Sequence, residues 1–218
     1  MFDALAAMPR YHATAPLDVL AALTLLSIVP FVVVSCTSFV RIVVVLSLVR
    51  SAIGASALPP NAVLTALSLV LTLVVMAPTL DRVGREAIAP YEHGALTQSQ
   101  ALERATGPLR AFMLRQTRAA DVELFERVAR RRPEPPANAP IVVLVPAFVV
   151  GELRSAFAIG FALYLPFVAI DLTVAAMLMG LGMMMLSPPV VSLPVKLLLF
   201  VMVDGWALVC GGVAASFR

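Results

Sequence analysis

The sequence predicts an all-α integral membrane protein, in which two helical hairpins flank a small helical polar domain. Of its 218 residues, 61% are hydrophobic and 13% are charged, against about 45–50% and about 25% in soluble domains. The mean hydropathy is +0.96. Four stretches are apolar over about 20 residues, which is the length of a membrane-spanning helix. A chain this poor in charge cannot cover its surface in water, so we expect lipid around it.

The four hydrophobic spans lie in two pairs, one at each end of the polar domain. They run from Val19 to Val40 with an interruption at Pro30, from Ala62 to Leu80, from Phe157 to Leu178, and from Val190 to Val213. Proline-rich turns separate the members of each pair, because proline is tolerated at the entrance of a helix. We therefore divide the sequence into an N-terminal segment (1–16), a first hydrophobic hairpin (17–80), a polar domain (81–140) and a second hydrophobic hairpin (141–218) with a methionine-rich turn.

The apolar run that begins at Leu17 is expected to be a retained anchor. It exceeds the roughly 7–15-residue core of a cleaved signal peptide, and Met1 to Pro16 carries Asp3 and a single Arg10. Beyond this run, residues 41–53 form an apolar continuation bounded by Arg41 and Arg50.

The polar domain is predicted to be helical and to carry balanced charge. It holds 18 of the chain's 29 charged side chains, ten arginines and eight acids, and no basic stripe with interleaved aromatics, so we expect no nucleic-acid partner. Residues 109–131 read as helix with a break near Thr117–Asp121, because Phe112 and Phe125 lie about 220° apart on one ideal helix. Asp121 could cap the second piece, and the proline-rich residues 132–140 form a linker.

The membrane orientation is predicted from the short first loop. Arg41 and Arg50 favour a cytoplasmic position for that loop, which places the polar domain and both termini outside the cytoplasm. The ten arginines of the polar domain argue the other way, but a segment of this length follows the positive-inside rule weakly. We therefore expect an extracytoplasmic (periplasmic) polar domain.

Five charged side chains interrupt or border the second pair of spans: Glu152, Arg154, Asp171, Lys196 and Asp204. A charge in a span costs about 2.5–3.5 kcal/mol on insertion scales, so such residues pair or face water. Lys196 and Asp204 are eight residues apart on one predicted helix and too distant to pair. Asp171 and Lys196 lie 17 and 8 residues from Pro188, which predicts different depths and favours partners on other chains. Pairing within the chain through a kink is left open.

Five of the ten methionines fall between Met177 and Met185. Thioether side chains are unbranched and adapt their shape to varied contacts, and Gly180 and Gly182 add backbone freedom beside them. Met183, Met184 and Met185 could therefore form a deformable seal, or they could be ordinary hydrophobic filler.

No catalytic, metal or cofactor site is predicted. Cys36 and Cys210 sit alone in apolar runs and are expected to be small buried hydrophobes. His12 and His93 lie in polar stretches without partners at metal-ligand spacing. The sequence contains no G-x-x-x-x-G-K-[ST] loop for nucleotides, and Asp171 and Asp204 lack the Gly-x-Gly-Asp element of an intramembrane aspartyl protease.

Several blocks of the sequence resemble, in order, the FliP/SctR (YscR/HrcR-like) family of type III secretion export proteins. The blocks are residues 146–161 (PAFVVGELRSAFAIGF), 165–172 (LPFVAIDL), 182–188 (GMMMLSP) and 192–206 (SLPVKLLLFVMVDGW), with residues 38–45, 59–64 and 108–118 upstream. The resemblance spans about residues 20–210. Gly151, Ala158 and Val195 depart from the usual residues, which affects details of helix packing.

The resemblance implies a protein-conducting gate and no enzyme. Members form a homopentamer in the inner membrane, partly periplasmic, with SctS/FliQ-type and SctT/FliR-type subunits, while SctU/FlhB-type and SctV/FlhA-type proteins attach from the cytoplasm and unfolded substrates pass through. By this analogy Met183, Met184 and Met185 line the constriction. Phe112 and Phe125 are candidates for the lumen wall, and Glu152 for pairing between subunits.

Two further expectations concern the branch of the family and the main alternative. Flagellar members commonly have a signal sequence and a longer N-terminus, so this chain is expected in the injectisome (virulence) branch. The alternative function is a small-solute membrane channel or transporter subunit. That function would predict inverted repeats or polar residues converging in broken spans, and the two hairpins here are not similar in sequence.

Overall fold

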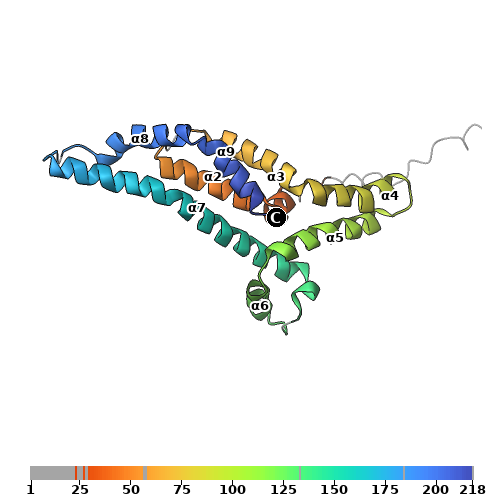
Figure 1. The fold of residues 1–218 in the computed structure, drawn as a ribbon. Coiled ribbons are helices and arrows are strands. Elements are labelled where there is room, and N and C mark those ends of the chain that lie inside the picture. The colour runs from red at the N-terminus through yellow and green to blue at the C-terminus, as the bar shows by residue number, and fades with distance from the viewer. Residues whose placement is uncertain are drawn as a thin grey trace, which may run out of the picture. The chain divides into compact units, whose positions relative to one another are not determined.

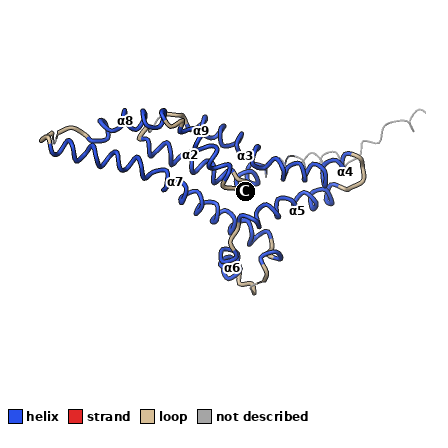
Figure 2. The backbone as a smooth tube through the Cα atoms, viewed as in Figure 1, coloured by secondary structure: helices blue, strands red, loops and turns tan. Residues whose placement is uncertain are grey.

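The computed structural model describes residues 23, 27, 29–55, 58–132, 134–183 and 185–217. The predicted N-terminal segment and most of the first span before Val29 lie outside the described residues. The chain divides into two compact units, Met1–Val33 and Val34–Arg218. All regular elements in the described part are helical, without a strand (Figure 2), so the predicted all-α class is confirmed.

Two helical segments are long and apolar enough to cross a membrane singly, Asn61–Glu92 and Ile141–Gly180. Two more candidate spans are each a pair of helices joined at a bend, Val29–Cys36 with Phe39–Ile53 and Pro188–Met202 with Gly205–Ala215. The described chain thus has two to four candidate spans, in agreement with the predicted membrane protein, although their boundaries differ from those predicted.

Helix α2 (Phe39–Ile53) is the apolar continuation that the sequence placed after the first span. Pro30 does not interrupt the helix as expected, because residues 29–36 are helical, and the helix breaks instead at Thr37 and Ser38. At its C-terminal end α2 stops at Gly54, whose φ of 86° is the left-handed conformation that glycine adopts without steric cost.

Helix α3 (Asn61–Val83) continues well beyond the predicted end of the second span. It passes through a π-helical turn, η2 (Gly84–Ile88), into α4 (Ala89–Glu92). The polar residues from Asp81 onward therefore extend the span as a helix. Helix α5 (Gln98–Gln116) then packs back along α3 and η2 (Figure 1). It begins with a capping box formed by Thr97 and Gln100.

The predicted break near Thr117–Asp121 is confirmed, since α5 ends at Gln116 and α6 (Ala119–Val128) begins two residues after Thr117. Asp121 does not cap α6 as expected: the N-cap position is Arg118, without a side-chain cap bond. Among its described residues, the proline-rich linker contains one regular element, the short 3-10 turn η3 (Pro136–Asn138).

Helix α7 (Ile141–Gly180) has 40 residues and includes Pro146 and Pro166. The third span was predicted to cover only Phe157–Leu178. The observed helix begins at Ile141 and therefore exceeds the predicted span by more than four turns at its N-terminal end. The predicted fourth span is divided into α8 (Pro188–Met202) and α9 (Gly205–Ala215), which are bent by 65° at Val203 and Asp204. Asp204 adopts a left-handed φ of 48° at this bend.

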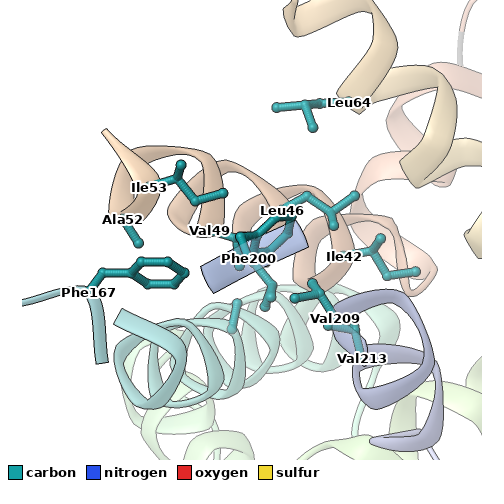
Figure 3. Close-up of a cluster of buried hydrophobic side chains, with 12 residues drawn as sticks. Ile42, Leu46, Val49, Ala52, Ile53, Leu64, Phe167, Phe200, Val209 and Val213 are labelled. Carbon is teal, nitrogen blue, oxygen red and sulfur yellow. The ribbon is translucent and has the colours of Figure 1, made fainter. Parts of the chain in front are cut away.

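Helix α2 lies at the centre of the main hydrophobic core and packs along α7 (Figure 3). Ile42, Leu46 and Val49 are almost wholly buried there, together with Phe200 of α8 and Val213 of α9. A second, smaller cluster joins α6 to the start of α7 and comprises Val122, Ala139, Val143 and Ala147. The first cluster thus includes residues of α2, α7 and α8, and the second includes residues of α6 and α7.

Candidate functional site: buried charge pairs and the methionine loop

Arg41 and Glu152 form a buried ion pair between α2 and α7. Arg41 Nε donates to Glu152 Oε2 at 2.8 Å and Nη2 donates to Oε1 at 2.5 Å. Their side chains are 4% and 0% exposed. Such a two-point geometry matches the guanidinium fork to both carboxylate oxygens. The side chain of Glu152 thus finds its counter-charge within its own chain.

The remaining N–H groups of Arg41 bind α5 and the segment after α9. Nη1 donates to the carbonyl oxygen of Ser216 at 2.9 Å and to its Oγ at 3.1 Å, and Nη2 donates to Gln116 Oε1 at 3.1 Å. The guanidinium carbon lies 3.9 Å from the ring centre of Phe217. All five donors of Arg41 are therefore engaged, and one side chain connects α2, α5, α7 and residues 216–217. We call this set the Arg41 network.

The Arg41 network changes the basis of the predicted orientation. That prediction counted Arg41 as a loop charge, but Arg41 lies in the first turn of α2 and is buried against α5, α7 and residues 216–217. A charge that is neutralised inside the fold carries no information about the side of the membrane. Of these two arginines, Arg50 alone then supports a cytoplasmic position for the loop, and the membrane orientation stays a prediction that rests on one charge.

Arg154 and Asp121 join α7 to α6 through two hydrogen bonds of 2.7 Å. Arg154 is 44% exposed and Asp121 is 5% exposed. The hydrogen bonds from Arg154 hold the pKa of the Asp121 carboxyl below its ordinary value, against an opposing effect of burial. Asp121 thus stabilises α6 by binding α7, which explains why it is not an N-cap.

Lys196 of α8 pairs with Asp171 of α7. Lys196 Nζ donates to Asp171 Oδ2 at 2.5 Å and to the carbonyl oxygen of Ala52 at 3.3 Å, near the C-terminal end of α2. Ser192 Oγ donates to Asp171 Oδ1 at 2.6 Å. The lysine is 6% exposed and the aspartate 36%. This junction joins the middle of α8 to α7 and to the C-terminal end of α2.

The expectation that Asp171 and Lys196 lie at different depths is wrong. The sequence count started from Pro188 on both sides, as if the turn were tight. In the structure α7 ends at Gly180 and α8 begins at Pro188, so Asp171 lies nine residues before one helix end and Lys196 eight residues after the other. The seven-residue loop between the helices restores their registry.

Asp204 has no part in these pairs. The sequence placed it on one helix with Lys196, but α8 ends at Met202, and Asp204 stands at the N-terminal end of α9 as an exposed side chain. Its backbone N–H donates to the Val201 carbonyl at 3.1 Å, which closes the bend. A carboxylate at this position is favoured by the partial positive charge of a helix N-terminus.

Of the two aromatic residues proposed for a lumen wall, Phe112 lies inside the chain. It is 3% exposed and contacts the rings of Phe148 and Phe217, with centroids 5.9 and 6.3 Å away. Phe125 is half-buried and packs on the cluster between α6 and α7. In this chain Phe112 is therefore a core residue beside the Arg41 network.

The loop between α7 and α8 exposes its methionines, and we call residues 181–187 the methionine loop. Met183 is 48% exposed and Met185 is fully exposed, while Met184 lies outside the described residues. Met177 and Met179, on the last turn of α7, are each 62% exposed. The loop thus exposes flexible apolar side chains at the tip of the α7–α8 hairpin.

Sequence reasoning missed Arg41 as a site residue and found the other charges without their partners. The available signal was a lone arginine in an apolar run, which in a buried helix demands an acid. Its partner Glu152 lies 111 residues away, and nothing local identifies it. Among the described residues, no group of three or more His, Cys, Asp or Glu side chains is placed to hold a metal ion.

Comparison with known proteins gives similarity over nearly the whole chain. The model of the FliP family matches residues 22–213. The flagellar biosynthetic protein FliP of Pectobacterium carotovorum subsp. carotovorum is 49% identical over 205 residues, which cover 94% of this chain and 80% of that protein. The protein of the same name from Caulobacter vibrioides is 49% identical over 197 residues, or 90% and 74% of the two chains. That of Bacillus subtilis is 41% identical over 207 residues, or 94% of both.

Proposed function

This chain belongs to the FliP family, and on that premise we propose that it is a non-enzymatic subunit of a flagellar-type protein-export apparatus in the bacterial inner membrane. The proposal is carried by the match to proteins named flagellar biosynthetic protein FliP along 94% of the chain. In more detail, we propose that five copies of the chain form a homopentamer. It would be joined to SctS/FliQ-type and SctT/FliR-type subunits and contacted by SctU/FlhB-type and SctV/FlhA-type proteins. Unfolded proteins would cross the membrane through the middle of this assembly.

The relatives favour the flagellar branch over the expected injectisome branch. The three relatives described above carry the flagellar name. The Bacillus subtilis protein aligns with this chain over 94% of its own length, so a longer N-terminus is not required of a flagellar relative. We therefore do not retain the argument from length that favoured an injectisome.

The length of α7 supports an assembly that stands partly outside the bilayer. A helix of 40 residues is about 60 Å long at 1.5 Å per residue, whereas the hydrocarbon core is about 30 Å thick. Glu152 and Arg154 lie in the N-terminal part of this helix and are paired with α2 and α6. This end of α7 is thus built for a protein environment, as the partly periplasmic position of the proposed assembly requires.

The methionine loop is the proposed seal of the passage. The Asp171–Lys196 pair fixes α7 to α8 below the loop, while the exposed thioethers of Met183 and Met185 project from it. A fixed base with deformable side chains at its tip can close against neighbouring copies and yield around a passing polypeptide, because thioethers accommodate varied shapes. Phe125 is retained as a candidate contact of the passing chain, whereas Phe112, packed against Phe148 and Phe217, is not.

The experiment is replacement of Met183, Met184 and Met185 by alanine in the native gene. We expect the assembled complex to form normally and the membrane to leak small ions, since alanine cannot fill the space that three thioethers occupy. Ion permeability and co-purification of the partner subunits are measured together. The matched control replaces Met177 and Met179, which are also exposed, at 62% each, but lie on α7 before the loop.

A second measurement separates export from the alternative of a small-solute channel. Deleting the gene should abolish secretion of the filament subunit while leaving uptake of small solutes unchanged. If secretion continues in the deletion strain, the export function is rejected. An unaltered permeability barrier in the triple-alanine strain would reject the seal alone.

A further inference from the structure

An apolar pocket lies at the bend between α8 and α9, beside the loop that joins α2 to α3. Its volume is about 610 Å³, within the range of about 300–1,000 Å³ that ligand pockets occupy. The lining comes from four helices and the loop and includes Ile53, Pro59, Val63, Leu64, Phe200 and Trp206. Leu64, Ile53 and Phe200 appear in Figure 3 around the end of α2. The pocket therefore offers a hydrocarbon-like interior without a carboxylate or amide in these walls.

A cation stands at the edge of this apolar pocket. Arg50 Nη1 donates to the carbonyl oxygen of Pro59, a lining residue, at 3.2 Å and to Asn61 Oδ1 at 2.6 Å. Its Nε and Nη2 groups have no hydrogen-bond partner in the described part of the chain. These two groups form the side of a guanidinium that binds two oxygens of a phosphate or carboxylate at once.

The start of α3 adds to the positive potential at the same edge. Asn61 is the first residue of α3, and Val63 and Leu64 donate their backbone N–H groups to the Pro60 carbonyl. The N-terminal end of a 23-residue helix carries a partial positive charge that favours an anion. The pocket is thus apolar inside and cationic at one edge.

We propose that the pocket binds one acyl chain of an anionic phospholipid, with the phosphate held by Nε and Nη2 of Arg50. A membrane-embedded chain meets such molecules at high local concentration, and basic pockets between membrane helices bind anionic headgroups. An apolar peptide segment would fill the interior but leave the cation without a counter-charge. A free anion would satisfy Arg50 but leave the apolar interior empty. The phospholipid matches both parts.

Trp206 is the only tryptophan of the chain and lines this pocket, so its fluorescence reports on an occupant directly. The full chain is reconstituted in vesicles of phosphatidylcholine to which phosphatidylglycerol with brominated acyl chains is added. Bromine quenches tryptophan only at close range. We expect quenching that saturates at a low mole fraction, and weaker quenching by brominated phosphatidylcholine at the same mole fraction.

Two variants test the two halves of the site. V63F places a larger side chain in the pocket and should remove the saturable quenching. Its matched control is V70F, two helical turns along the same face of α3, because Val63 and Val70 are 51% and 58% exposed and Val70 does not line the pocket. R50Q should retain quenching but lose the preference for phosphatidylglycerol, whereas R85Q, on the exposed surface of η2, should keep it.

The proposal is overturned if quenching rises linearly and equally with both lipids, or if V63F behaves as the native chain does. It is also overturned if Trp206 in the purified heteromeric complex is inaccessible to the brominated lipid, because another subunit then occupies the pocket. Each variant must show native helix content by circular dichroism. These results are independent of the secretion assay, so the lipid site and the export function fail separately.

Discussion

At the scale of the residue, Arg41 is the side chain on which most other contacts depend. It neutralises Glu152, donates a hydrogen bond to Gln116 Oε1 and holds residues 216 and 217 beside α2. Gln116 Nε2 also donates to the Phe217 carbonyl at 3.4 Å, and Phe217 stacks on Phe112. Four segments that are distant in sequence therefore share one guanidinium, and their relative positions are set by its fixed planar geometry.

Replacing Arg41 by methionine should destabilise the chain by roughly 3–5 kcal/mol, because Glu152 would be left as an unpaired buried charge. Thermal unfolding in detergent measures the loss. Replacing Glu152 by methionine as well should restore much of the stability, since a well-packed apolar pair can equal a buried ion pair. The control is Arg115→Met on the exposed side of α5. Equal stability of the single variant and the native chain would contradict the role of Arg41.

Asp121 makes the attachment of α6 depend on pH. Because Arg154 lowers the pKa of Asp121 in the folded chain, the pair stabilises the fold fully above the ordinary aspartate pKa of about 3.9. That stability is lost as the pH falls below this value and through the lower, folded pKa. The protection of α6 amides against hydrogen exchange, measured relative to the intrinsic exchange rate at each pH, should therefore fall at acidic pH in the native chain. In Asp121→Asn, this protection should already be lower near neutral pH and should change less in acid; an unchanged acid response would contradict the pair.

The sequence identified which charges matter but not what they bind. Four of the five charges named from the sequence, all except Asp204, take part in the three tertiary pairs. The cost of burying a charge is a local property that a single residue reveals. The choice of partner depends on how helices far apart in the sequence are placed, as Arg41 and Glu152 illustrate. Loop length decided the pair of Asp171 and Lys196, and that length was misjudged by the seven residues that separate α7 from α8.

At the scale of the element, the contact between α2 and α7 rests on a residue without a side chain. A Cβ at Gly160 would lie 2.3 Å from Leu48 Cδ1 and 3.1 Å from Leu48 Cβ. Glycine thus allows the two helices to approach closely, as small residues do in membrane proteins. This approach brings Arg41 of α2 within reach of Glu152, two turns earlier on α7.

Gly160→Ala should lower the stability by about 1–3 kcal/mol, the usual cost of overpacking. Leu48→Ala in the same chain should recover part of the loss, because it removes the Cδ1 atom that clashes. Unfolding in detergent measures both variants. Gly211→Ala serves as the control, since a Cβ there meets no atom within 4 Å. A Gly160→Ala chain as stable as this control would show that α2 and α7 separate without cost.

Elements were predictable where a local pattern determined them. The break at Thr117 followed from the phase of the apolar residues, and the end of helix in the linker followed from its prolines. The bend at Asp204 was not predicted, because its apolar surroundings read as one span. At the bend, Gly205 packs closely on Phe200, because a Cβ at Gly205 would lie 2.3 Å from the Phe200 ring. No local sequence pattern shows this contact.

At the scale of the whole molecule, a large apolar surface calls for neighbours. Phe157, Phe161 and Leu165 are more than half exposed at spacings of four residues along α7. Because α7 exceeds the thickness of the hydrocarbon core, lipid cannot cover its full length at a modest tilt. We expect other protein subunits to cover part of it, in line with the proposed heteromeric assembly.

The mass of the gently solubilised complex tests this conclusion. We expect particles that contain a pentamer of the 23.1 kDa chain together with smaller membrane subunits. Light scattering or native mass spectrometry gives the mass, and chains dissolved in a harsher detergent provide the monomer reference. A stable monomer or dimer under gentle conditions would contradict the assembly and the proposed passage.

The unbroken course of α7 also has a mechanical consequence. Its N-terminal part is joined to α6 by Arg154 and its C-terminal end carries the methionine loop. We therefore expect a push or twist at α6 to be passed along this continuous helix to its tip. If the proposed passage closes at this tip, we expect strain from a moving cargo to return along the same helix, which would couple force and opening in both directions.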